Sequence, residues 1–185
     1  MSFRTTGFLL IILLALGGYV YNNVLNKPKP PSAPRPFVYQ YEMTDIISME
    51  LKYNNKTTSV YLDPSSDDWK FTDPAVGEVD AGRLNGIRLL LSGPGANRLL
   101  SFNEAPNQSQ LGEYGFGRPT VVANITLKDA RQHTVLLGDQ TPDGKNYYTK
   151  NGDSDSVYLV DYTWANVLKR FVDEPPVKKA VEGAS

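Results

Sequence analysis

Cysteine is absent from this chain of 185 residues, and histidine occurs once, as His133. Without cysteine the protein can form no disulfide, no thiolate metal site and no cysteine nucleophile. One histidine cannot supply an ordinary zinc site, and a Ser-His-Asp triad would have to use it. Because His133 follows Asp129-Ala-Arg-Gln132, we expect it to be a solvated residue in a turn or at the start of a strand. The sequence therefore predicts no catalytic residue, no metal site, no cofactor and no enzyme activity.

An excess of charge is also missing, because 19 Lys and Arg residues face 20 Asp and Glu residues. Without a basic field, the chain is not expected to bind nucleic acid. Two acidic loops, residues 63–68 and 151–155, offer oxygen ligands but lack the spacing of an EF-hand, which favours solvated turns. Gly93-Pro-Gly95 lacks the remaining residues of a dinucleotide or phosphate loop and is interpreted as a helix stop.

One long apolar run is present near the start of the chain. Residues 7–25 carry no charge, and about 18 helical residues rise roughly 27 Å, close to the hydrocarbon thickness of a bilayer. This predicts a transmembrane anchor after a cytoplasmic N-terminus at residues 1–6, with the lipid bilayer as a partner. The anchor residues are Phe8, Leu9, Leu10, Ile11, Ile12, Leu13, Leu14, Leu16, Tyr19 and Val20. A signal peptide cleaved near Gly17 is the alternative interpretation.

A proline-rich segment comes after the apolar run. Residues 27–36 contain five prolines, so residues 26–36 are expected to form an extended, semi-rigid spacer. The basic residues downstream of the apolar run would keep the following domain in the cytoplasm by a simple count. A short apolar segment behind a short basic head is instead typical of a signal anchor that exports the domain attached to it. We therefore expect the domain to lie on the extracytoplasmic side of a bacterial membrane.

The remaining sequence predicts an α+β domain at residues 37–173, built of antiparallel β-hairpins and two main helices. Strands are expected at residues 44–53, 58–62, 67–72, 97–102, 119–127, 134–137, 146–149 and 157–160, from alternating apolar residues and intervening turns. One main helix begins after Asp80 and the other after Asp161, since aspartate is a favourable N-cap. A helical turn is expected after Asn107. Residues 174–185 are predicted to be a disordered tail.

The two halves of this domain resemble each other faintly. Met49-Glu-Leu-Lys52 resembles Ile125-Thr-Leu-Lys128, and each half has the order hairpin, third strand, helix. One interpretation is a pair of similar βββα lobes with a groove between them. The other is that common strand and turn patterns recur without any duplication.

Tyrosine is frequent, with 11 residues in the chain. Several lie near the ends of predicted strands, and tyrosine favours interfaces because it buries a large area at little entropic cost. The candidate interaction surface consists of Tyr39, Tyr41, Tyr147, Tyr148, Tyr158 and Tyr162. Ordinary β-sheet composition is the alternative explanation.

The order of motifs in residues 37–173 resembles the DUF4340 family, a domain of unknown function. The most specific part is Leu111-Gly-Glu-Tyr-Gly-Phe-Gly-Arg-Pro119, followed about twenty residues later by Leu-Leu-Gly138 and then by Tyr147-Tyr148. Phe116 stands where the family more often has leucine. The resemblance implies a bacterial membrane-anchored protein with an extracytoplasmic α+β domain, in some cases associated with ABC-type transport systems. It supplies no catalytic residues.

Together these features predict a single-pass, non-catalytic interaction protein. We expect an accessory subunit or assembly factor of an integral membrane complex, because the chain combines one anchor, a stiff spacer and no catalytic residues. The alternative is an extracytoplasmic ligand-binding module working with an ABC-type transporter, which would need an aromatic pocket. A hydrolase of envelope polymers is the third and least supported hypothesis.

Overall fold

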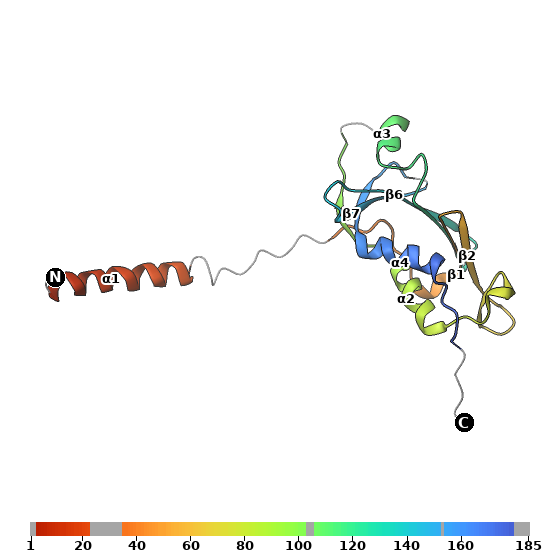
Figure 1. The fold of residues 1–185 in the computed structure, drawn as a ribbon, viewed down its shortest axis with the longest axis horizontal. Helices are drawn as coiled ribbons and strands as arrows, with labels where there is room; N and C mark the ends of the chain where they lie inside the picture. Colours follow the sequence, from red (N-terminus) through yellow and green to blue (C-terminus); the bar gives the residue numbers. More distant parts are fainter. Residues whose placement is uncertain (1–2, 23–34, 103–105, 153, 180–185) are drawn as a thin grey trace, which may run out of the picture. The chain divides into compact units, whose positions relative to one another are not determined.

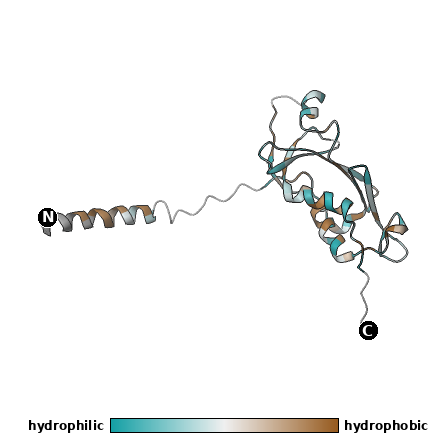
Figure 2. Cartoon of the chain, viewed as in Figure 1, coloured by the Kyte–Doolittle hydropathy of each residue, from teal (hydrophilic) through white to brown (hydrophobic). Residues whose placement is uncertain are grey.

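The computed structural model describes residues 3–22, 35–102, 106–152 and 154–179. The chain divides into two compact units, residues 1–34 and 35–185 (Figure 1). In the first unit, helix α1 spans Phe3–Val20. Its described large apolar side chains, from Leu9 to Val20, are exposed, and Figure 2 shows apolar residues on successive turns.

Among the residues that the structure describes, no helix is both long enough and apolar enough to cross a membrane. The side chains of Phe8, Leu10 and Ile11 lie outside the described part of the chain, as do residues 23–34 of the predicted spacer. The membrane anchor and the spacer therefore stay predictions.

The second unit is built on one eight-stranded sheet with the strand order β3-β2-β1-β5-β6-β7-β8-β4, in which every neighbouring pair is antiparallel. The strands are β1 Ile46–Tyr53, β2 Lys56–Leu62, β3 Trp69–Phe71, β4 Ala96–Leu99, β5 Val121–Leu127, β6 Gln132–Gln140, β7 Asn146–Asn151 and β8 Tyr158–Asp161. The predicted α+β class is confirmed. The short helices are η2 Met43–Asp45, η3 Pro74–Val76 and α3 Gln108–Glu113.

Local sequence explains how these strands form. Asn54 and Asn55 join β1 to β2 with positive φ angles of 48° and 59°, the backbone of a two-residue type I′ turn that asparagine tolerates. β5 alternates fully buried with half-buried residues along its whole length, as its apolar alternation predicts.

The two halves of the domain meet at β1 and β5. These strands pair along their length, with Met49 opposite Ile125. The first half follows the predicted order of hairpin, third strand and helix, whereas the second half has a further strand, β8, between its third strand and α4. The strands form one continuous sheet instead of two separate lobes. The groove expected between lobes is replaced by backbone pairing, because both strands place apolar residues on the same face and can share one core.

Two helices cover the concave face of this sheet (Figure 1). Helix α4, Tyr162–Asp173, contacts β1, β2, β7 and β8, and α2, Ala81–Ser92, packs against α4. Both begin where the sequence predicts. Asp80 accepts a hydrogen bond from the backbone N–H of Arg83, and Asp161 accepts one from that of Thr163.

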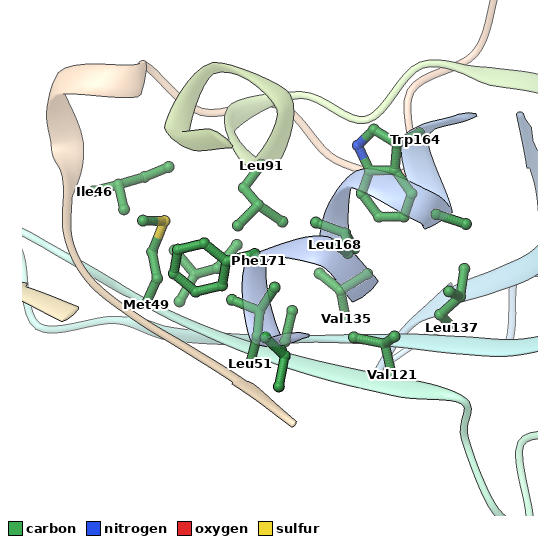
Figure 3. Packing of buried hydrophobic residues seen from close by; sticks show 14 of the residues in the cluster. Ile46, Met49, Leu51, Leu91, Val121, Val135, Leu137, Trp164, Leu168 and Phe171 are labelled. Carbon is green, nitrogen blue, oxygen red and sulfur yellow. The ribbon is translucent and has the colours of Figure 1, made fainter. Parts of the chain in front are cut away.

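The core lies between α4 and the sheet. Phe171 and Leu168 of α4 are 1 % exposed and point at the apolar residues of the central strands (Figure 3). Trp164 contacts α2, where its indole N–H donates a hydrogen bond of 3.0 Å to the carbonyl of Leu90. Residues of the cluster labelled in Figure 3 are Ile46, Met49, Leu51, Leu91, Val121, Val135, Leu137, Trp164, Leu168 and Phe171.

The folded domain extends past its predicted end at residue 173. Val177 forms a β-bridge with Val79, and the backbone N–H of Lys178 donates to the carbonyl of Glu78 over 2.8 Å. Residues 174–178, predicted to be disordered, are therefore attached to the domain by backbone pairing that Pro175 and Pro176 do not prevent. The rest of the predicted tail, residues 180–185, lies outside the described residues.

Candidate functional site on the outer face of the sheet

The structure does not bring the six predicted tyrosines together on one surface. Residues alternate between the two faces of a strand. Tyr147 and Tyr158 therefore face the helix-covered core, whereas Tyr148 points to the opposite, outer face. Tyr162, at the start of α4, is 45 % exposed.

Tyr147 has a structural role beneath α4. It is 7 % exposed, and the Lys169 ammonium donates a hydrogen bond of 2.5 Å to its hydroxyl. The same ammonium lies 4.2 Å from the centre of the Tyr147 ring and 5.9 Å from that of Tyr53. Because these contacts join α4 to β7 and β1 in the interior, Tyr147 is not available to a partner at the surface.

Tyr39 and Tyr41 surround the single histidine. His133 belongs to β6, pairs with Ile125 and is 5 % exposed, so the prediction of a solvated turn residue is wrong. Its ring centre lies 4.3 Å from that of Tyr39, and the Tyr41 hydroxyl is 3.2 Å from Nδ1. Burial, reinforced by the neighbouring Tyr41, raises the pKa of the Tyr39 hydroxyl above its usual range. This cluster fastens the start of the domain to the core.

On the outer face, Tyr148 contributes to a pocket of about 420 Å³ at the end of the sheet formed by β7, β8 and β4. Its ring centre lies 4.6 Å from that of Tyr114, which follows α3. Tyr114 also lies near Phe102, and the centres of these two rings are 6.1 Å apart. We call this the aromatic pocket, and its lining residues are Arg98, Leu100, Tyr114, Thr141, Pro142, Asp143, Asn146, Tyr148 and Leu159.

Close packing of backbone on backbone holds Tyr114 in place. The N–H of Asp139 in β6 donates to the Tyr114 carbonyl over 2.8 Å. A Cβ atom added to Gly138 would lie 2.0 Å from that carbonyl oxygen, and one added to Gly115 would lie 2.5 Å from the Asp139 backbone. Gly115 also has a φ of 83°, which favours glycine. The segment after α3 can dock on the sheet only because both positions lack a side chain.

Helix α3 begins at a capping box, which fixes the start of the same segment. The Asn107 side chain accepts from the N–H of Gln110 over 2.9 Å, and the Gln110 side chain accepts from the N–H of Asn107 over 3.0 Å. The predicted helical turn after Asn107 is thus confirmed. Its cap and its docking at β6 hold the backbone of Tyr114 in place.

The rim of the aromatic pocket is polar. Asn146 accepts a hydrogen bond of 2.7 Å from the side chain of Asn97, which ties the start of β7 to β4. Asp143 accepts from the Thr141 hydroxyl over 2.6 Å and from the N–H of Lys145 over 3.1 Å, and these bonds lower the pKa of its carboxyl. Among the described residues, Arg98 makes no ion pair. The rim therefore presents a fixed carboxylate, an amide and a guanidinium.

A larger cleft of about 830 Å³ lies at the opposite edge of the sheet, along β3. Its two lysines are already neutralised: Lys70 pairs with Asp63, and the Lys178 ammonium lies 3.3 Å from the Glu78 carboxylate. The hydrogen bond from Lys70 holds the pKa of the Asp63 carboxyl well below its usual range. Residues 74–79 contribute Pro74, Gly77, Glu78 and Val79 to the lining of this cleft, and its two cations are already engaged, unlike Arg98 in the aromatic pocket.

Sequence reasoning identified one residue of the aromatic pocket, Tyr148, and missed Arg98, Tyr114 and Asn146. Tyr114, Gly138 and Tyr148 lie in three different motifs of the sequence that carry the family resemblance. The structure brings these three separate motifs together at one place. The signal that could have found the pocket was the pair of glycines, Gly115 and Gly138, which mark a close backbone approach.

Comparison with known proteins supports the resemblance. Residues 69–175, more than half of the 185 residues, match the family described as Domain of unknown function (DUF4340). The match begins at β3, later than the start of the resemblance at residue 37, and continues past the end of α4. Neither curated proteins nor solved structures gave a match. From β3 through the aromatic pocket to the last helix, the chain has the sequence pattern of one family, and it belongs to DUF4340.

Proposed function

We propose that the protein is a single-pass, membrane-anchored, non-catalytic interaction protein whose α+β domain lies outside the cytoplasm. It serves as an accessory subunit or assembly factor of an integral membrane complex. The observation that carries this proposal is the exposure of apolar side chains on α1, where Leu13 is 69 % exposed and Leu14 68 %. Apolar surface of this kind is stable when lipid or another protein covers it.

The division of the chain into two units supports a tethered domain. The second unit has its own core, formed by the sheet, α4 and α2. The first unit, with its exposed apolar side chains, has the features of an anchor. The second unit, with its own core, has those of a domain that binds a partner.

Exposed apolar residues on the folded unit are candidate points of contact with such a partner. Leu89 on α2 is 62 % exposed, Phe37 is 47 % exposed and Leu99 on β4 is 42 % exposed. Large exposed apolar and aromatic side chains commonly anchor protein interfaces. The burial of His133 supports a non-catalytic role, because a histidine covered by Tyr39 and Tyr41 does not reach a substrate at the surface.

Affinity purification of the tagged, full-length protein in mild detergent tests this proposal. We expect a multi-helix membrane protein to be recovered in stoichiometric amounts and identified by mass spectrometry. The double variant Leu13→Lys/Leu14→Lys should leave the membrane fraction, because two ammonium groups on α1 are costly in hydrocarbon. Leu89→Lys, on the folded unit, is the matched control and should remain membrane-bound. Recovery of the wild-type protein alone, or outside the membrane fraction, would refute the proposal.

The second candidate function is an extracytoplasmic ligand-binding module that works with an ABC-type transporter. The aromatic pocket favours it, because a concave site with an aromatic floor and a few polar groups is typical of ligand-binding proteins. A transporter subunit among the purified partners would support this candidate over a purely structural accessory subunit.

A further inference from the structure

The aromatic pocket has the chemistry of a sugar-binding site. We propose that it binds an acidic saccharide, a sugar ring that carries a carboxylate, with Tyr148 and Tyr114 as the stacking floor and Arg98 as the anion-binding group. This inference goes beyond the proposed function, because it concerns a ligand of the domain whichever protein the chain accompanies.

The floor is suited to the apolar face of a sugar ring. The rings of Tyr114 and Tyr148 lie 4.6 Å apart and are inclined by 43°, so they pack against each other, and the side of the pair that lines the pocket is the surface available to a ligand. Tyrosine combines an apolar ring with a polar hydroxyl. Because Gly138 and Gly115 allow the Tyr114 backbone to dock tightly on β6, the floor exists before a ligand arrives, and little entropy is lost on binding.

The polar rim favours a ligand with many hydroxyl groups. Asp143 accepts hydrogen bonds, the Asn146 side chain both donates and accepts, and Arg98 donates. A hydroxyl group also donates and accepts, so a polyhydroxylated ring can satisfy each kind of group at once. A purely apolar ligand would leave these rim groups without partners when it displaced their water.

Arg98 is the reason that we expect the sugar to carry a carboxylate. It belongs to β4, opposite Leu159 of β8, and the side chains of both line the pocket. Among the described residues it has no carboxylate partner. A guanidinium binds a carboxylate through two parallel N–H···O bonds. The pocket volume of about 420 Å³ lies within the range of ligand sites, about 300–1,000 Å³.

Calorimetric titration of the full-length protein in detergent micelles tests the proposal with two probes of equal length, trigalacturonate and maltotriose. We expect trigalacturonate to bind at least about tenfold more tightly, because only it can pair with Arg98. Arg98→Gln should weaken trigalacturonate binding about tenfold and leave maltotriose binding unchanged. Tyr148→Ala should weaken the binding of both sugars about tenfold, while Tyr148→Phe keeps the ring and retains most of the affinity.

Two control variants lie away from the pocket. Arg170→Gln removes an exposed guanidinium from α4, and Tyr61→Ala removes a half-exposed ring from β2. Neither should change the affinity for either sugar. Arg98 is exposed, so Arg98→Gln should fold normally and can test the proposal even if Tyr148→Ala does not fold.

Three results would overturn the proposal: no binding of either sugar at millimolar concentration, affinities unchanged in both pocket variants, or equal affinity for the two sugars with no effect of Arg98→Gln. The purification experiment is independent of them. If Arg98→Gln loses the sugar but retains the protein partner, the interaction function and the sugar site are separate properties of the domain.

Discussion

The two halves of the sheet share an order of elements but use their helices differently. In the second half, α4 lies directly on the sheet and buries Ala165, Leu168 and Phe171 almost completely. In the first half, α2 packs on α4 and forms the outer layer, with Leu84 and Leu91 as its fully buried apolar residues. The comparison teaches that a repeated order along the chain need not produce equivalent positions, because here α4 covers the central strands and α2 packs on α4.

The halves also differ in the structures at their outer ends. The first half ends at β3, where Val79 and Val177 pair beside the edge. The second half continues into β8 and β4, and the segment after α3 covers its outer face. The aromatic pocket lies in this additional part and not at the seam between β1 and β5. The additional strands β8 and β4 contribute to the core through Val160 and Ala96 and to the candidate site through Leu159 and Arg98.

The largest expected effect tests the unequal roles of the helices. Phe171→Ala in α4 should lower the free energy of unfolding by about 3–5 kcal/mol, because it leaves a cavity between helix and sheet. Leu84→Ala in α2 should cost less within the range of about 2–5 kcal/mol for such substitutions, since fewer buried atoms are removed. Leu89→Ala, at a 62 % exposed position of α2, is the control and should change stability little. Urea denaturation followed by circular dichroism measures all three.

If Leu84→Ala destabilises the domain as much as Phe171→Ala, the two helices contribute equally and the comparison fails. If Leu89→Ala is also strongly destabilising, the outer face of α2 is covered by something that the folded unit does not contain.

The next effect tests how the candidate site is attached. Gly138→Ala places a Cβ atom 2.0 Å from the Tyr114 carbonyl oxygen, so the segment after α3 must move away from β6. We expect a loss of about 1–3 kcal/mol in stability and a separation of the Tyr114 and Tyr148 rings. The separation is measured as lost nuclear Overhauser contacts between these rings.

Gly117→Ala is the matched control in the same segment, because nothing lies within 4 Å of the added atom. It should leave both stability and ring contacts unchanged. Ring contacts that survive in Gly138→Ala would mean that the docking of Tyr114 does not depend on the glycine.

Local features of the fold could be predicted from the sequence. The Asn54-Asn55 turn and the caps at Asp80, Asn107 and Asp161 depend on hydrogen bonds within a few residues, so short patterns are sufficient. The order of the strands required more. β4 joins β8, about sixty residues later in the chain, and nothing in its four residues specifies that partner.

The wrong predictions for His133 and Tyr147 could have been avoided by using the alternation of side chains along a strand. His133 lies two and four residues before Val135 and Leu137, so period-two alternation places it on the core face with them. The same alternation puts Tyr147 and Tyr148 on opposite faces. The approach of Tyr114 to Tyr148 could not be predicted in this way, because it depends on the docking of a separate segment at Gly138.

A smaller effect compares the hairpins of the two halves. The β1–β2 turn places asparagines at positive φ, whereas the β5–β6 turn places Ala130 there, with a φ of 66°. Asparagine tolerates this conformation, but alanine is strained in it by about 1–2 kcal/mol. Ala130→Gly should therefore stabilise the domain by about 1 kcal/mol, and Asn55→Gly by a few tenths. Thermal unfolding of the two variants measures both gains in stability. Equal gains would show that the two turns are equally strained.

The smallest effect concerns the seam between the halves, where Glu50 of β1 faces Asn124 of β5. The Glu50 carboxylate lies 2.9 Å from the Lys52 ammonium and accepts from the Asn124 side chain over 3.1 Å. The hydrogen bond from Lys52, with help from Asn124, lowers the pKa of Glu50. A carboxyl group whose pKa is lower in the folded state stabilises the protein above its unfolded pKa, about 4.3, and loses that contribution as the pH falls through the folded pKa.

Glu50→Gln should therefore reduce stability at pH 7 by about 0.2–1 kcal/mol, the range for a largely exposed ion pair, and by nothing once the pH is below the lowered pKa of Glu50. The difference from wild type should shrink as the pH falls below about 4.3 and through the lowered pKa of Glu50, as urea denaturation at a series of pH values would measure. Glu42→Gln, at an exposed carboxyl group outside the sheet, is the control and should change stability at pH 7 little. A difference that persists at the acidic end of the series would mean that the Glu50 side chain joins the halves by its packing and not by its charge.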